Sequence, residues 1–214
     1  MRTPSAPSTP LAPATKIRTP AGWGLPRTIE ETHIGLGGPD MKVACVLANG
    51  FEDSEFKQPY DALREAGHEV TIVGLQAGQH LTGDKGRETA TVEKAFADVR
   101  PDQFDALLIP GGFSPDRLRA HPVAVEFVGA FFDARKPIMA ICHGPQIFIP
   151  AGKYRDHRLT AWKTIQSDLK LLGADVVDEE VVVDRNLVTS RQPQDIPAFI
   201  REGLKLLEAT PARR

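Results

Sequence analysis

The sequence predicts an α/β fold: a doubly wound, mostly parallel sheet with helices on both faces and a hairpin at one edge. Three observations predict it. Short apolar runs of strand length recur at 42–48, 105–110 and 137–142. Segments with helical spacing follow them, and a β-rich stretch at 181–190 is interrupted by turn-forming residues. Strands that alternate with helices are typical of a parallel sheet covered on both faces.

The first half of the predicted sheet begins directly after Met41. Residues 42–48 (KVACVLA) are almost continuously apolar, as a strand buried on both faces should be. A helix is expected from about 54 to 66, with Gly67 just beyond its end and an irregular first turn at Pro59. Residues 68–75 then form a second strand, so this region predicts one β-α-β unit.

The second half repeats the alternation and then departs from it. Residues 105–110 form a strand that Gly111-Gly112 ends, 123–134 form a helix, and 137–142 form another buried strand. A helix is expected from 144 toward 152. The run 181–190, with Asp184-Arg185-Asn186 at its middle, predicts an edge hairpin. The last helix, about 195 to 208, has its apolar residues on one face and is expected to pack on the sheet.

Composition indicates a single domain with an appendage, and a domain of this size needs no disulfide or metal for stability. The chain has 214 residues, 41% of them hydrophobic, and a formal net charge of −2, which favours neither nucleic acid nor an anionic membrane as partner. No apolar run is long enough to span a bilayer. The two cysteines, Cys45 and Cys142, form no disulfide framework, which predicts a reducing, cytoplasmic location.

Residues 1–40 differ from the rest of the sequence and are expected to form a disordered tail. They are rich in Pro, Ser and Thr, and their first acidic residue is Glu30. Proline density disfavours regular structure. A basic, acid-poor start is also compatible with a transit peptide, although the prolines disfavour an amphipathic helix. A third reading makes Met41 the biological start. The folded domain is therefore predicted to cover 41–210.

Three loops are expected at the carboxyl edge of the sheet, where ligands bind in such folds: 49–53, 110–113 and 142–145. Cys142 lies at a strand-to-helix turn, which lifts a side chain out of the sheet as a nucleophile elbow does. A helix dipole behind it would favour the thiolate. From the residues alone, a reactive thiol and a small buried core residue are equally good readings. Cys45, inside the first strand, is expected to be core.

Five motifs in order make the chain resemble the PfpI family of intracellular cysteine peptidases, deglycases and glyoxalases. They are NGFEDSE (49–55), LIPGGFSPDRLR (108–119), AICHGPQ (140–146), LTAWK (159–163) and EEVVVDRNLVTSRQPQDIPAF (179–199). The resemblance runs from about 41 to 208. It implies a flavodoxin-like, class I glutamine-amidotransferase-like fold and a homo-oligomer.

The resemblance also implies roles for particular residues. Cys142 is the expected nucleophile, His143 its neighbour in a triad, and Glu52 a protonated carboxyl that hydrogen-bonds the sulfur. The backbone N–H groups of Gly112 and His143 are the expected oxyanion hole. Asp116 stands where family peptidases use an acid from a neighbouring subunit, although its place after Ser-Pro equally suits a helix start.

The expected function is that of a cysteine hydrolase acting on carbonyl carbon. Deglycase or glyoxalase action on glyoxal-derived adducts, in stress protection, is favoured because it needs only a thiol, a nearby acid and an oxyanion site. Peptide hydrolysis is the alternative, and a redox-responsive stress protein without a dedicated substrate is the alternative from another class. A class I glutaminase is not expected, because it needs a His and a Glu downstream of its cysteine and His157 is the only histidine beyond the adjacent His143. No cofactor and no metal is expected.

Overall fold

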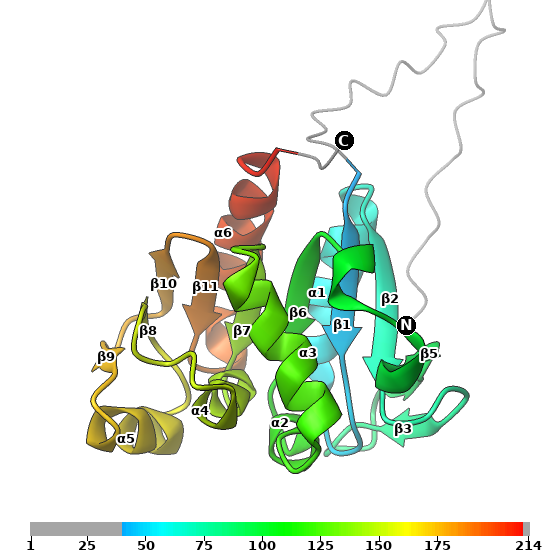
Figure 1. Cartoon of the computed structure of the whole chain (residues 1–214), viewed down its shortest axis with the longest axis horizontal. Coiled ribbons are helices and arrows are strands. Elements are labelled where there is room, and N and C mark those ends of the chain that lie inside the picture. The colour runs from blue at the N-terminus through cyan, green and yellow to red at the C-terminus, as the bar shows by residue number, and fades with distance from the viewer. Residues whose placement is uncertain (1–39, 212–214) are drawn as a thin grey trace, which may run out of the picture. The chain divides into compact units, whose positions relative to one another are not determined.

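The computed structural model describes residues 40–211. The predicted tail, 1–40, falls outside this range except for Asp40, so the boundary at residue 41 stays a prediction. Within the described range the α/β prediction is confirmed, and the order of its elements is the one in Figure 1.

The core of the molecule is one seven-stranded sheet with the order β10-β11-β7-β6-β1-β2-β5. All neighbours pair in parallel except β10 and β11, which form the predicted antiparallel hairpin at one edge. Omitting β5 and β10, the order is second, first, third, fourth, fifth, which is the flavodoxin-like winding. The strands are β1 (Lys42–Val46), β2 (Glu69–Gly74), β5 (Lys94–Ala95), β6 (Ala106–Ile109), β7 (Ile138–Ile141), β10 (Val181–Asp184) and β11 (Leu187–Ser190).

Helices cover both faces of this sheet, as Figure 1 shows with α3 in front and α1 and α6 behind. Strand β1 shows why: Val43 and Cys45 join the core under α1 and α6, whereas Ala44 and Val46 join the core under α3 and α4. Alternate side chains on two apolar faces need two covering layers. The helices are α1 (Asp53–Glu65), α2 (Ser114–Leu118), α3 (Pro122–Asp133), α4 (Phe148–Ala151), α5 (Lys163–Leu171) and α6 (Ile196–Glu208).

The structure adds small elements that the pattern did not predict. They are the hairpin β3 (His80–Thr82) with β4 (Thr89–Thr91), the short parallel pair β8 (Arg158–Leu159) with β9 (Asp175–Val176), and the single turns η1 (Phe96–Asp98), η2 (Pro101–Gln103) and η4 (Pro193–Asp195). Two or three residues of strand give no readable periodicity.

The helix expected from 144 toward 152 is present over 144–151, but its first half is a 3₁₀ turn. The segment is one 3₁₀ turn, η3 (Gly144–Ile147), followed by the single turn α4. Pro150 cannot donate a backbone hydrogen bond to the turn before it, and Gly152 ends the segment in the left-handed region at φ 68°.

The expectation that three loops share one edge of the sheet is confirmed. The loop after β1 and the loop after β6 are joined by an antiparallel bridge between Phe51 and Gly112. The amide of Phe113 donates to the carbonyl of Gly50 at 2.6 Å, and the amide of Glu52 donates to that of Gly111 at 3.2 Å. The third loop carries Cys142, directly beside them.

Candidate active site

Cys142 occupies a sharp turn at the end of β7, as the elbow prediction requires. Its φ is +61°, in the left-handed region that residues with a Cβ rarely adopt. Its amide donates to the carbonyl of Ser190 at 2.9 Å, and its carbonyl accepts from the amide of Trp162 at 2.8 Å. The side chain is 6% exposed. Such a backbone persists only where neighbouring contacts fix it, and this is common at reactive positions.

Four groups surround the sulfur. The Nδ1 atom of His143 lies 3.2 Å from Sγ. The backbone N–H groups of Gly112 and His143 interact with the thiol, which is where an oxyanion hole is expected. The fourth group is the carboxyl of Glu55, which forms a side-chain hydrogen bond with Cys142. The sequence prediction that a carboxyl meets the sulfur is therefore matched by Glu55.

Glu52 does not lie in the predicted place, and this is a correction. It is the N-cap of α1: its Oε2 accepts from the Ser54 hydroxyl at 2.6 Å and from the Glu55 amide at 2.8 Å. Its Oε1 accepts from Lys85 Nζ at 2.5 Å. A cap residue folds its side chain back over the first turn, so it cannot also reach the thiol. Glu55 stands one turn further into the helix and points the other way.

The two glutamates consequently differ in charge state. Burial acts to raise the pKa of Glu52, but the hydrogen bonds from Lys85, Ser54 and the Glu55 amide outweigh burial and lower it. For Glu55, burial and then the negative charge of Glu52 raise the pKa to about 8. Glu55 is fully buried, and its Oε2 accepts from the Gly111 amide at 3.1 Å. Its Oε1 is buried and has no hydrogen-bond partner among the described residues.

The surroundings of Cys142 act both against and for the expected thiolate. Burial raises the pKa of the Cys142 thiol, and the charge and hydrogen bond of ionised Glu55 raise it further. The N–H groups of Gly112 and His143 act in the opposite sense. Since the raising effect of Glu55 needs its negative charge, protonation of Glu55 makes the thiol easier to ionise.

His143 is neutral at physiological pH and free to accept a proton. Burial lowers its pKa, and the charge of Asp116 only partly offsets that. Its ring stacks on Trp162, with centroids 6.2 Å apart and an interplanar angle of 24°. A neutral imidazole within hydrogen-bonding distance of a thiol has the geometry of a general base.

Asp116 lies near His143 without a hydrogen bond between them in the part of the chain that the structure describes. Its carboxylate pairs with Arg119 Nη2 at 2.8 Å and accepts from Gln146 Nε2 at 3.4 Å. The side chain is half exposed. It stands in the first turn of α2, but the Ser114 hydroxyl accepts from the Ala48 amide rather than capping that helix. A triad role for Asp116 stays a prediction.

Gly111 and Gly112 are required by the close packing of this site. A Cβ on Gly111 would lie 2.3 Å from Glu55 Oε2 and 2.6 Å from the Cβ of Cys142. Gly112 has φ +73°, and a Cβ there would lie 2.4 Å from the Glu52 amide nitrogen. The glycine pair is thus a tight turn and also the surface on which acid and thiol meet.

Sequence reasoning missed Glu55, Lys85 and Trp162 as parts of the site. A signal for Glu55 was available: it shares a helix face with Pro59 and Leu63, four and eight residues on, and both are buried. An acid on a buried helical face needs a partner, whereas one at a helix start does not. Lys85 and Trp162 come from loops whose paths leave no periodic signal.

The remaining histidine after the elbow and the remaining cysteine lie away from the thiol. His157 is buried beside Asn186, with Nε2 and Oδ1 3.2 Å apart. Asn186 lies in the hairpin turn before β11, at the amino ends of the parallel strands, whereas Cys142 lies at their carboxyl ends. Residues 40–211 contain no group of three or more His, Cys, Asp or Glu arranged to hold a metal ion. No helix in that range is long and apolar enough to cross a bilayer. Cys45 is fully buried in β1, as predicted.

Comparison with known proteins agrees with this geometry. Residues 41–206 match the DJ-1/PfpI family. Protein/nucleic acid deglycase 2 of Escherichia coli is 50% identical over 169 residues, which are 78% of this chain and 98% of that protein. General stress protein 18 of Bacillus subtilis is 51% identical over 168 residues, with the same coverage of each chain. A second Bacillus subtilis relative, named as a cysteine protease, is 47% identical over 167 residues, 78% of this chain and 98% of that protein.

A solved structure supports the same assignment. A two-domain protein from Anabaena variabilis with DJ-1/ThiJ/PfpI-like and ferritin-like domains superposes with a TM-score of 0.76 at 35% identity. The match covers 80% of this chain and 50% of that one. Fold, motif order, coverage and identity agree, and the chain belongs to the DJ-1/PfpI family.

Proposed function

We propose that this chain is a cysteine hydrolase that acts on glyoxal-derived carbonyl compounds and adducts, as a deglycase or glyoxalase in stress protection. One observation carries the proposal: the thiol of Cys142 shares a hydrogen bond with a buried carboxyl, Glu55, whose pKa is about 8. A group that gains and loses a proton near neutral pH suits general acid–base catalysis. The relatives named deglycase and general stress protein support the same reading.

With methylglyoxal as example, the reaction begins with addition of the sulfur to the aldehyde carbon. An S–C bond forms, the thiol proton passes to His143 Nδ1, and the carbonyl oxygen gains an electron pair and then that proton. The N–H groups of Gly112 and His143 stabilise the charge on this oxygen as it develops. The product is a neutral hemithioacetal on Cys142.

The second stage moves a proton within the bound substrate. Ionised Glu55 takes the proton from the former aldehyde carbon and returns one to the neighbouring carbon, through an enediol. The former aldehyde carbon becomes a thioester and is oxidised, while the neighbouring ketone is reduced to an alcohol. Water then cleaves the S–C bond, releasing a 2-hydroxy acid and the thiol. Oxidation and reduction balance inside one molecule, so no external redox partner is needed.

Peptide hydrolysis through an acyl-enzyme is the second candidate. The 3.2 Å contact between His143 Nδ1 and the sulfur favours it, as does the relative named as a cysteine protease. It also needs an acid that orients His143. The candidate acid from the family motif, Asp116, is paired with Arg119, so this function needs that pair to rearrange.

A homo-oligomer is part of the proposal. Phe113 follows the oxyanion residue Gly112 and is 65% exposed, and half-exposed Asp116 stands on the next helix. Sedimentation of the purified chain tests this, and a monomer at all concentrations contradicts it. The two free cysteines support a reducing compartment, and we place the protein in the cytoplasm on that basis.

The deciding experiment compares methylglyoxal, a glycated peptide and casein as substrates of the purified chain. Turnover of the first two, lost in Cys142→Ala and kept in Cys45→Ala, is the expected result. The second variant is a matched control, because Cys45 is fully buried in the sheet. Cleavage of casein alone would replace the proposal with the peptidase. No turnover of any substrate, with Cys142 readily oxidised, would favour the redox-responsive stress protein.

A further inference from the structure

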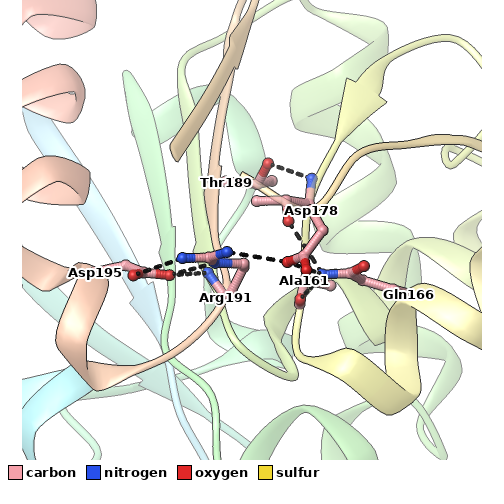
Figure 2. Close-up of polar contacts among 7 residues, drawn as sticks. Ala161, Gln166, Asp178, Thr189, Arg191 and Asp195 are labelled. Atoms are coloured by element: carbon pink, nitrogen blue, oxygen red, sulfur yellow. Dashed lines mark hydrogen bonds and ion pairs between the residues drawn. The ribbon is translucent and has the colours of Figure 1, made fainter. Parts of the chain in front are cut away.

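A partly buried polar cluster lies next to the two segments that hydrogen-bond the Cys142 backbone. It consists of Gln166, Asp178, Arg191 and Asp195, here called the Arg191 cluster, and Figure 2 shows it between the end of β11 and the start of α5. None of these residues contacts the sulfur, and the reaction above uses none of them. Asp195 and Gln166 are buried, at 4% and 6% exposed.

The contacts within the cluster are close and directional. Arg191 holds the Asp195 carboxylate with both Nε (2.9 Å) and Nη2 (3.2 Å) and donates from Nη1 to Asp178 at 3.0 Å. The Gln166 amide nitrogen lies 3.2 Å from the same Asp178 oxygen. A two-pronged arginine–carboxylate contact fixes orientation as well as distance.

The cluster is bonded to the two segments that hold the Cys142 backbone. Gln166 Nε2 donates to the carbonyl of Ala161 at 2.9 Å, next to Trp162, whose amide donates to the Cys142 carbonyl. On the other side, Arg191 follows Ser190, whose carbonyl accepts the Cys142 amide. The Cys142 backbone, with φ +61°, therefore makes its two hydrogen bonds to Trp162 and Ser190. Each of these is the sequence neighbour of a residue in contact with the cluster or part of it.

We propose that the Arg191 cluster is a positioning device, which holds Cys142 in its left-handed conformation and Trp162 against the ring of His143. A positive φ at a residue with a Cβ relaxes unless its surroundings hold it. Relaxation would turn the sulfur away from Glu55 and the oxyanion N–H groups. Arg191 and Gln166 are thus positioning residues for a thiol that they do not touch. The inference builds on the proposed function but is tested separately from it.

The test uses Gln166→Leu, which cuts the link to the 160–162 segment and leaves the Arg191–Asp195 pair intact. The matched control is Gln103→Leu, because Gln103 also makes a hydrogen bond to the main chain, from the Arg100 amide at 2.8 Å, but is exposed in η2. Turnover of methylglyoxal is expected to fall about 10- to 100-fold in Gln166→Leu and to stay unchanged in the control. Arg191→Lys keeps the charge but loses the two-pronged contact. Its turnover of methylglyoxal is expected to lie between those of Gln166→Leu and the control.

Two readouts need no substrate. The first is the rate of Cys142 alkylation by iodoacetamide against pH, followed by mass spectrometry. The second is Trp162 fluorescence in a Trp23→Phe background, since the chain has two tryptophans. A protonated imidazole quenches a stacked indole, so the fluorescence reports the titration of His143, which lies against the Cys142 sulfur and near the charge of Asp116. In the parent protein the fluorescence is expected to change with a midpoint below pH 6.5, because the His143 pKa is lowered. In Gln166→Leu the midpoint is expected nearer pH 6.5, and the fluorescence change is expected to be smaller.

The possible results separate the alternatives. Parent-like alkylation and fluorescence in both Gln166→Leu and Arg191→Lys, with only a lower Tm, would make the cluster merely structural and overturn the proposal. If Gln166→Leu does not fold, Arg191→Lys decides by the same readouts. A parent protein that turns over no tested substrate would refute the proposed function, while alkylation and fluorescence would still decide the role of the cluster.

Discussion

Replacing Glu55 with glutamine is expected to change how stability depends on pH. In the folded protein the Glu55 pKa is about 8, against 4.5 for the ordinary group. Between these values the folded state keeps a proton that the unfolded chain releases. The free energy of unfolding therefore falls as pH rises through this window, by up to about 1.4 kcal/mol per pH unit.

The size of the effect follows from the width of the window. From pH 4.5 to pH 7.5 the wild-type protein loses up to about 4 kcal/mol from this one group. Glutamine has a similar shape, can still accept from the Gly111 amide, and has no proton to lose. Glu55→Gln should therefore gain that amount relative to wild type across the same window, while its turnover falls by about 10²- to 10⁴-fold.

Urea unfolding of both proteins at several pH values between 4.5 and 7.5 measures the difference. Glu52→Gln is the comparison variant: its own ionisation acts below this pH window, and within the window the loss of its charge lowers the Glu55 pKa. The Glu52 pKa is lowered in the folded state, so its carboxylate contributes stability that is present above 4.5 and lost as pH falls through the lowered value. A gap between wild type and Glu55→Gln that stays constant with pH would refute the assignment of a buried, protonated Glu55.

Three further outcomes are expected. Cys142→Ala should lose all turnover and keep its circular dichroism spectrum, because a strand-end thiol leaves only a small space; retained turnover would remove Cys142 as nucleophile. Lys85→Met should shift the Glu55-dependent limb of the pH–rate profile to higher pH, since the Lys85 charge lowers the Glu55 pKa; an unmoved limb would contradict this. Deleting residues 1–40 should leave Tm and turnover unchanged, and a Tm drop of many degrees would show that the boundary at 41 is wrong.

Most of the sheet could be predicted from the sequence because its strands are buried on both faces. Runs such as KVACV in β1 and IMAI in β7 are apolar at every position but the first Lys, which is the pattern of a central parallel strand. The edge hairpin was readable for a different reason, namely its turn residues between two β-rich runs. Helix α5 was not predicted, although the LTAWK motif precedes it, because it is short and half polar.

The site could be predicted as a location but not as a geometry. The family motifs led to Cys142, His143 and Gly112, which the structure brings together around the sulfur. They also led to Glu52 in place of Glu55, because both acids stand in NGFEDSE. Which one faces the thiol depends on where α1 begins, and the hydrogen bond from the Glu55 amide to the Glu52 side chain fixes that point. Local contacts decide which of two acids three residues apart faces the thiol, and a sequence motif does not encode those contacts.

The bridge between Phe51 and Gly112 has a mechanical consequence. It fastens the loop that leads into α1, and hence the acid, to the loop that carries an oxyanion donor. The two loops then move as one body, so thermal motion changes the distance between acid and donor less than it would for separate loops. The carboxyl and the N–H donor are therefore already oriented in the folded protein, and little reorganisation is needed during the reaction. Hydrogen exchange at the amides of Glu52 and Phe113 should accordingly be slow, and slow together.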